Sequence, residues 1–223
     1  MSRPAATPDR RRASKAQTRD RLLHAAIDVL IEEGYPGFSM NKVAKRAGIA
    51  QPSFYAHFEN TDQLLDALAD DLLLQYLKPI QQSVLGVVKQ LQQADARPLL
   101  ERLFLMAFAV VKSQQALVRM VWAEREQPVS HFGGRLRDLF QQIRASWAQV
   151  LVDIGLVPDS PANQLRLQLF MDGVFALFES YAGLWMDGRY DNEQALATAL
   201  TDYVLHFWRD EISVFFAAKT AHN

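Results

Sequence analysis

The stretch FSMNKVAKRAGIAQPSFYAHFENTDQLL, residues 38–65 of a 223-residue chain, decides the fold. Ser39 can cap a short helix over residues 40–47, and Gly48 then allows a tight turn. A second short helix follows over residues 51–58, with a proline in its first turn, where a missing backbone N–H costs nothing. Two short helices joined by a glycine turn predict a helix-turn-helix.

The residues of this stretch divide into a packing set and an exposed set. We expect apolar and small side chains to hold the two helices together, namely Val43, Ala44, Ala47, Ile49 and Phe54. The outer face of the second helix then carries Gln51, Ser53, Tyr55, Ala56 and His57. Side chains of this kind can bond phosphates or base edges, and a helix of this length fits a DNA major groove.

Helical periodicity extends over the rest of the chain, and the two-residue alternation typical of strands is nearly missing. Ser14 and Gln17 can form a capping box for a first helix that ends at Gly34, and Asn60 or Thr61 caps a later one. Longer helices are expected over residues 98–112, 114–126, 131–154, 163–186 and 192–218, the third interrupted early by Gly133-Gly134. We therefore predict an all-α fold, with an N-terminal three-helix unit that contains the helix-turn-helix and a larger C-terminal helical bundle.

Charge is divided unevenly along the chain. The total of 24 Lys and Arg against 25 Asp and Glu gives a formal net charge of −1. Residues 1–60, however, carry ten basic and six acidic side chains, so this segment has a charge of +4 and the remainder −5. Such asymmetry favours a polyanion as the partner of the N-terminal end, although a solvated basic tail would have the same composition.

Several classes of protein are disfavoured. We expect no transmembrane helix, because no apolar run reaches 18 residues, and no secretory signal, because the first residues lack an apolar core. The absence of cysteine excludes disulfides and thiol nucleophiles and fits a cytoplasmic protein. The five histidines lack metal-ligand spacing, and there is no phosphate-binding glycine loop or nucleophile elbow. We therefore expect a protein that is not an enzyme and uses no cofactor or metal.

A specific set of residues between Lys15 and Tyr76 goes beyond a generic helix-turn-helix. It comprises Thr18, Leu22, Ala25, Ala26, Gly34, Phe38, Ser39, Val43, Ala44, Ala47, Gly48, Ile49, Ser53, Phe54, Tyr55, His57, Phe58, Leu64 and Leu65. With these residues the chain resembles the TetR family of bacterial transcriptional regulators. It departs from the family pattern at Ala50, where Ser or Thr is usual, and at Thr61, where Lys is usual.

The resemblance implies that the helix over residues 51–58 enters the major groove of a palindromic DNA operator. The DNA-binding residues expected on this basis are Ser39, Gln51, Pro52, Ser53, Tyr55, Ala56, His57, Thr61, Lys15 and Arg19. Tyr55 and His57 match positions that commonly meet the phosphate backbone, whereas Gln51 and Ser53 are candidates for reading bases. Plain packing is the alternative role for Tyr55.

The resemblance also implies how the chain is divided. We expect a disordered basic arm over residues 1–14, a helix-turn-helix domain over residues 15–60, a linking helix over residues 61–78 and an effector-binding and dimerisation domain over residues 79–223. The linking helix, with Pro79 at its end, would act as the hinge. The function implied is a repressor released by a small apolar or amphiphilic effector. A regulator or architectural protein controlled by a protein partner is the alternative.

The large domain offers candidates for an effector pocket. Aromatic residues that could form its wall, or equally an ordinary core, are Phe104, Phe108, Trp122, Phe175, Phe178 and Tyr181. A pocket with such a wall suits an apolar ligand. Arg119 and Arg125 could receive an anionic head group, or could be exposed partners of Glu124 and Glu126.

The last two helices predict a homodimer. The final helix is apolar over more than half of its circumference, so it must bury two sides. One side can meet its own bundle, and the other a second copy of the chain. The interface is expected to contain Leu205, Trp208, Ile212 and Phe215, together with a strip of small residues at Gly173, Ala176 and Ser180.

Overall fold

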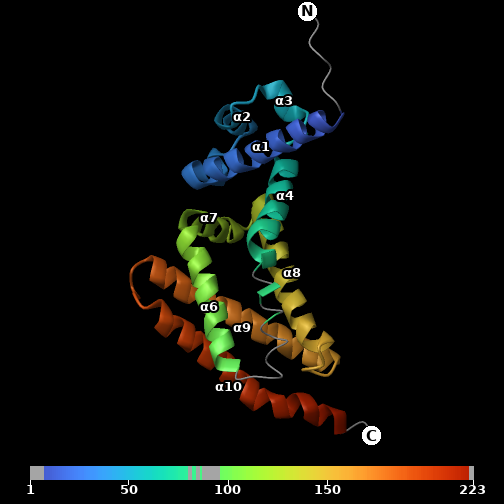
Figure 1. Ribbon diagram of the computed structural model, residues 1–223, viewed down its shortest axis with the longest axis vertical. Coiled ribbons are helices and arrows are strands. Elements are labelled where there is room, and N and C mark those ends of the chain that lie inside the picture. Colours follow the sequence, from blue (N-terminus) through green and yellow to red (C-terminus); the bar gives the residue numbers. More distant parts are fainter. Residues whose placement is uncertain (1–7, 80–81, 84–85, 87–95, 221–223) are drawn as a thin grey trace, which may run out of the picture. The chain divides into compact units, whose positions relative to one another are not determined.

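The computed structural model describes residues 8–79, 82–83, 86 and 96–220, although for residues 8–12, 76–77 and 209–220 it describes the backbone alone. Every regular element in these ranges is a helix, which confirms the all-α prediction (Figure 1). None of these helices is by itself long and apolar enough to cross a membrane; one bent pair, residues 96–113 with 115–125, meets that test by length and composition.

The helices form two compact units. The first, called the head here, contains the described residues up to Leu72 together with Ala116–Arg137, and the second, called the bundle, contains those of Leu73–Gln115 and of residues 138–223. The head therefore includes Ala116–Arg137, a segment that lies much later in the chain. We had expected residues 15–60 to contact DNA and residues 61–78 to link the domains.

The head is built from α1 (Pro8–Gly37), α2 (Met40–Ala47), α3 (Gln51–Tyr55), α4 (Thr61–Leu72), almost all of α7 (Gln115–Arg125) and the start of α8 (His131–Asp153). Its core contains large side chains that are almost completely buried, among them Leu22, Leu23, Leu30, Phe54, Leu64, Leu65 and Leu68. Burial of each such side chain contributes about 1.5–3 kcal/mol. The long helix α1 packs against both α2 and α4, and so connects these two shorter helices.

Several helices differ from the sequence prediction. α1 begins at Pro8, inside the stretch expected to be a disordered arm, and Ser14 lies within it instead of capping it. The residues after Pro8 are rich in Arg, Ala and Lys, which favour helix. α8 is not interrupted at Gly133-Gly134. α3 stops at Tyr55 instead of continuing to residue 58, and a turn follows it.

The bundle contains the π-helix η1 (Leu73–Leu77), α6 (Ala96–Ser113), the rest of α8, α9 (Pro161–Met186) and α10 (Glu193–Thr220). Ser160 caps α9 and the Asn192 side chain accepts the Ala195 amide at 3.0 Å, so α9 and α10 each start at a polar cap. α10 lies along α6 and α9 (Figure 1). Phe170 on α9 stacks on Phe207 on α10, with ring centroids 4.1 Å apart, within the apolar core that joins the two helices.

Candidate nucleic-acid interface

The residues of α3 and of the turn after it divide into buried aromatic side chains and exposed or half-buried ones. Phe54 is completely buried and Phe58 is 2% exposed. The expected DNA contacts on this segment all lie at the surface or half-buried: Gln51, Pro52, Ser53, Tyr55, Ala56 and His57. Tyr55 is 46% exposed, so it contributes little to the core, although its ring meets the edge of Phe54 at 5.8 Å.

The direction of α3 is set by the turn before it. Gly48 has φ 63° and ψ 38°, a left-handed conformation that favours glycine, and its amide and that of Ile49 bond back to carbonyls of α2. The side chain of Ser39 caps α2 by accepting the Lys42 amide at 3.4 Å. Ala50 precedes α3 without a side-chain cap. The glycine turn and the buried Phe54 therefore position the five-residue helix.

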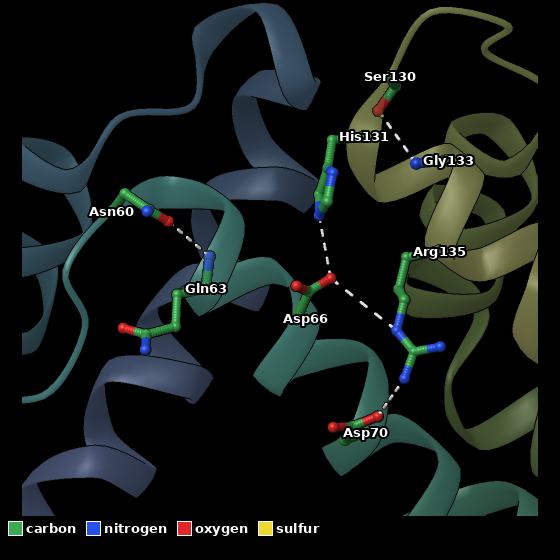
Figure 2. A network of polar contacts seen from close by, with 8 residues as sticks. All are labelled: Asn60, Gln63, Asp66, Asp70, Ser130, His131, Gly133 and Arg135. Atoms are coloured by element: carbon green, nitrogen blue, oxygen red, sulfur yellow. Dashed lines mark hydrogen bonds and ion pairs between the residues drawn. The ribbon is translucent and has the colours of Figure 1, made fainter.

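A reciprocal capping box connects the turn after α3 to α4. The Asn60 side chain accepts the Gln63 amide at 2.8 Å, and the Gln63 side chain accepts the Glu59 amide at 2.6 Å. Figure 2 shows the first of these bonds. Of the two capping residues left open by the sequence, the structure selects Asn60, and Thr61 is the first residue of the helix.

The basic side chains near the helix-turn-helix differ in their partners. Lys42 pairs with Glu33, and Arg46 pairs with Glu32, so these two cations of α2 are paired with acids of α1. The hydrogen bond from Arg46, and then its charge, lower the pKa of Glu32. Lys15 and Arg19 on α1 are exposed, and no acidic side chain in the described part of the chain pairs with either of them.

Arg19 lies close to the turn that follows α3. Its guanidinium carbon is 5.6 Å from the ring centroid of Phe58, a cation–π distance. His57, which precedes Phe58 in the chain, is half-buried. Burial, and then the charges of Lys15 and Arg19, lower the pKa of His57. The lowered pKa favours the neutral imidazole at pH 7, and no acidic side chain of the described residues pairs with the two cations at this edge of the head.

α7 is fastened to the end of α1 through a buried carboxylate. The Glu124 side chain accepts a hydrogen bond from the backbone N–H of Tyr35 at 3.1 Å, and Glu124 is 6% exposed. Sequence reasoning placed Glu124 at the surface as a partner of arginine and missed this contact. Arg125 does pair with Glu126, at 3.2 Å.

α4 is fastened to the start of α8 by a second set of contacts, drawn in Figure 2. Asp66 accepts a hydrogen bond from His131 at 3.0 Å, and Arg135 pairs with Asp70 at 2.7 Å. These side chains are 31–57% exposed. Within the described residues, no three His, Asp or Glu side chains gather closely enough to hold a metal ion.

The residues expected in the effector pocket lie in both units. Phe104 and Phe108 are buried on α6, and Phe175, Phe178 and Tyr181 are half-buried on α9, all in the bundle. Phe108 meets Phe178 with ring centroids 5.2 Å apart, so this pair belongs to one aromatic group. Trp122 lies on α7 in the head and is half-buried there.

The residues expected in the dimer interface divide by exposure. Ala176 and Ser180 are exposed on α9, while Leu205 and Trp208 on α10 are half-buried. Gly173 faces its own chain, because a Cβ there would lie 2.6 Å from the Tyr203 hydroxyl. Ile212 and Phe215 belong to α10, but their side chains lie outside the described residues.

Comparison with known proteins gives matches in the head. Residues 22–68 match the family model described as bacterial regulatory proteins, tetR family. The chain is 46% identical over 52 residues to the class A tetracycline repressor of Escherichia coli, a match that spans 23% of this chain and 24% of that protein. The class D repressor of Escherichia coli is 40% identical over 58 residues, and 27% of it is covered. These matches are therefore confined to about a quarter of each repressor.

Other matches extend over more of the chain at lower identity. The fatty acid metabolism regulator protein of Bacillus subtilis is 22% identical over 175 residues, which span 76% of this chain and 85% of that protein. The crystal structure of the transcriptional regulator FadR from Bacillus subtilis, solved in complex with stearoyl-CoA, has a TM-score of 0.59 at 18% identity and covers 82% of this chain and 95% of that one. A TetR transcription regulator from Haloarcula marismortui has a TM-score of 0.58 at 15% identity, with 84% and 96% covered.

The glycine turn, the short exposed helix and the buried aromatic pair beneath it define a helix-turn-helix protein. Within it, residues 22–68 are similar to the DNA-binding domain of the tetR family of bacterial regulatory proteins.

Proposed function

We propose that the protein is a transcriptional regulator that binds a palindromic DNA operator as a homodimer and represses transcription until a small apolar or amphiphilic effector releases it. The observation that carries the proposal is the exposed polar row of α3 above the buried Phe54 and Phe58, together with Lys15 and Arg19, which pair with no acidic side chain of the described residues. Gln51 and Ser53 at the start of α3 would read base edges, and the basic groups would bind phosphates.

An unpartnered apolar strip on α9 supports the homodimer. Leu165 and Leu169 are 58% and 62% exposed, and Ala176 and Ser180 continue the same helix face. Leucines on a helix face are stabilised by burial against a partner, and small residues allow close approach of two helices. A two-fold dimer would place its two copies of α3 in successive major grooves, roughly 34–36 Å apart, which is why the operator is expected to be palindromic.

Aromatic side chains on α6 and α9 support an apolar effector. Phe104 and Phe108 face the bundle core, and Phe178 meets Phe108. Such rings suit a ligand with a hydrocarbon portion. The similarity of the chain to FadR, which was solved with stearoyl-CoA, points in the same direction. A ligand that favours a dimer with a different spacing of its heads must weaken DNA binding, and DNA must weaken ligand binding by the same factor.

Selection of bound duplexes from a random DNA pool tests the proposal. We expect an enriched palindrome, and native mass spectrometry should find two protein chains per duplex. Gln51→Ala should change the selected bases at one position of each half-site, because a base contact is worth about 1–3 kcal/mol of discrimination. Gln164→Ala, an exposed change on α9, is the matched control and should select the wild-type sequence. Failure to enrich any sequence would contradict the proposed function.

A further inference from the structure

Two buried N–H donors without acceptors lie close together between α8 and α9. The indole Nε1 of Trp147 and the Nε of Arg144, one turn apart on α8, are buried and have no hydrogen-bond partner in the described part of the chain. Both side chains contact one ring of α9, because the Phe175 centroid is 5.0 Å from that of Trp147 and 5.9 Å from the Arg144 guanidinium carbon. Buried donors are nearly always paired in folded proteins, so an acceptor is expected at this place.

The charge of Arg144 is already matched by a carboxylate. Asp172 on α9 has one oxygen 2.7 Å from the Nε of Arg144, but the pair lacks the geometry of a hydrogen bond. Asp172 therefore neutralises the guanidinium without satisfying this N–H. An acceptor that joins the pair meets two N–H donors and no net charge. A neutral carbonyl oxygen fits these donors, whereas a carboxylate would add a negative charge to a pair that is already neutral.

The other neighbours of Trp147 are apolar. Its side chain packs against a buried core cluster that includes Leu151 on α8 and Leu167 on α9. Leu103 on α6 and Phe207 on α10 pack against the same cluster. A ligand that brings an acceptor to Trp147 is therefore expected to have a hydrocarbon portion, because apolar surface is stabilised by burial against such side chains.

We propose that Trp147 and Arg144 bind the carbonyl oxygen of an ester or a thioester of a hydrocarbon chain, with Phe175 in contact with both donors. The inference rests on the proposed function, because it names the chemical class of the effector and gives it a polar contact on α8. Both N–H groups donate to the one carbonyl oxygen, which has two lone pairs. A free fatty acid, which is ionised at pH 7, is the ligand that this arrangement disfavours.

The NMR signal of the Trp147 indole N–H tests the contact directly. In the full chain labelled with ¹⁵N-tryptophan, the Trp147→Phe variant identifies this signal by its disappearance. Methyl laurate, lauroyl-CoA and dodecane are the probes, each added below the concentration at which it aggregates. We expect methyl laurate, lauroyl-CoA or both to move the signal downfield, because a hydrogen bond deshields the indole proton, and the two probes distinguish an ester from a thioester. Dodecane, which has no acceptor, should not produce this shift.

The affinities of methyl laurate and laurate test the charge argument, because the two probes have the same chain and differ in the charge of the head group. Calorimetry of the wild type should give a dissociation constant for laurate about tenfold higher than for methyl laurate, or more. Asp172→Asn removes the charge that matches Arg144, so laurate should then bind at least as tightly as methyl laurate. Trp147→Phe should weaken methyl laurate by about two- to tenfold, the contribution of one hydrogen bond. Gln141→Ala, an exposed change on α8, is the matched control and should bind as the wild type does.

The outcomes separate this contact from the function on which it rests. The contact is overturned if neither carbonyl probe moves the Trp147 signal, if dodecane moves it equally, or if the wild type binds laurate as tightly as methyl laurate. If Trp147→Phe does not fold, assignment of the wild-type spectrum replaces the variant. Failure of the DNA selection overturns the proposed function, and the titrations, which contain no DNA, still decide the contact. Binding as expected with no change in the dissociation constant for DNA overturns the effector role alone.

Discussion

The carboxylate of Glu124 on α7 accepts a hydrogen bond from the backbone N–H of Tyr35, 89 residues earlier in the chain, at 3.1 Å. Tyr35 lies near the end of α1, shortly before Ser39 and α2. Glu124 is 6% exposed, and its second oxygen has no hydrogen-bond partner in the described part of the chain. The bond thus attaches the entry to the helix-turn-helix to a helix from much later in the sequence.

Replacing Glu124 tests the energy of this attachment. Glu124→Ala leaves the part-buried Tyr35 amide without this acceptor, so the head should lose about 1–3 kcal/mol in free energy of unfolding. Glu124→Gln keeps one acceptor oxygen and removes a buried charge, so it should cost less. Urea denaturation followed by circular dichroism measures both. Glu126→Ala, at an exposed carboxylate, is the control, and a loss in Glu124→Ala no larger than in this control would contradict the assignment.

α8 approaches the end of α7 closely at Gly133 but not at Gly134, so substitutions at these two glycines can be compared to test this contact. A Cβ on Gly133 would lie 2.3 Å from the Glu124 carbonyl oxygen and 3.0 Å from that of Gln127, both backbone atoms. Gly133→Ala should therefore destabilise the head by about 1–3 kcal/mol, because the start of α8 must move away.

At Gly134 a Cβ would meet nothing nearer than an Arg137 side-chain nitrogen at 3.6 Å. Gly134→Ala should be neutral, or stabilising by about 0.5–1 kcal/mol, because alanine favours helix over glycine. The same denaturation experiment compares the two variants, and equal effects would show that the close approach at Gly133 has no energetic consequence.

The sequence predicted those features of the site that depend on residues close together in the chain. Ser39, Gly48 and Phe54 act within a few residues of themselves, so the helix-turn-helix and its division into buried and exposed residues could be read directly. Glu124 and Gly133 depend on contacts whose partners lie elsewhere in the chain or in a neighbouring turn. A glutamate beside two arginines looks like a surface residue, and a Gly-Gly pair looks like a helix break, unless the packing around them is known.

The ion pairs between α4 and α8 should contribute less than the Glu124 bond. Arg135 and Asp70 lie 2.7 Å apart, but their side chains are 31% and 57% exposed. Exposed pairs contribute about 0–1 kcal/mol and weaken with salt. Arg135→Gln should therefore cost less than about 1 kcal/mol at low salt and almost nothing at about 1 M salt. Denaturation at the two salt concentrations measures this, and a loss that persists at high salt would contradict the electrostatic account.

Without DNA, the environment of His57 should make the head less stable in acid. Burial, then Lys15 and Arg19, hold the pKa of His57 below 6.5 in the folded chain, so the unfolded chain binds the proton more readily. The stability due to neutral His57 is therefore fully present above the unfolded pKa of about 6.5 and is lost as the pH falls through the lower, folded value.

Thermal unfolding of wild type and His57→Gln between about pH 5 and 8 isolates this contribution, because the variant retains every other titrating group. The wild type should lose more stability than the variant as the pH falls. A difference that is independent of pH would mean that His57 fills space in the head without exchanging a proton.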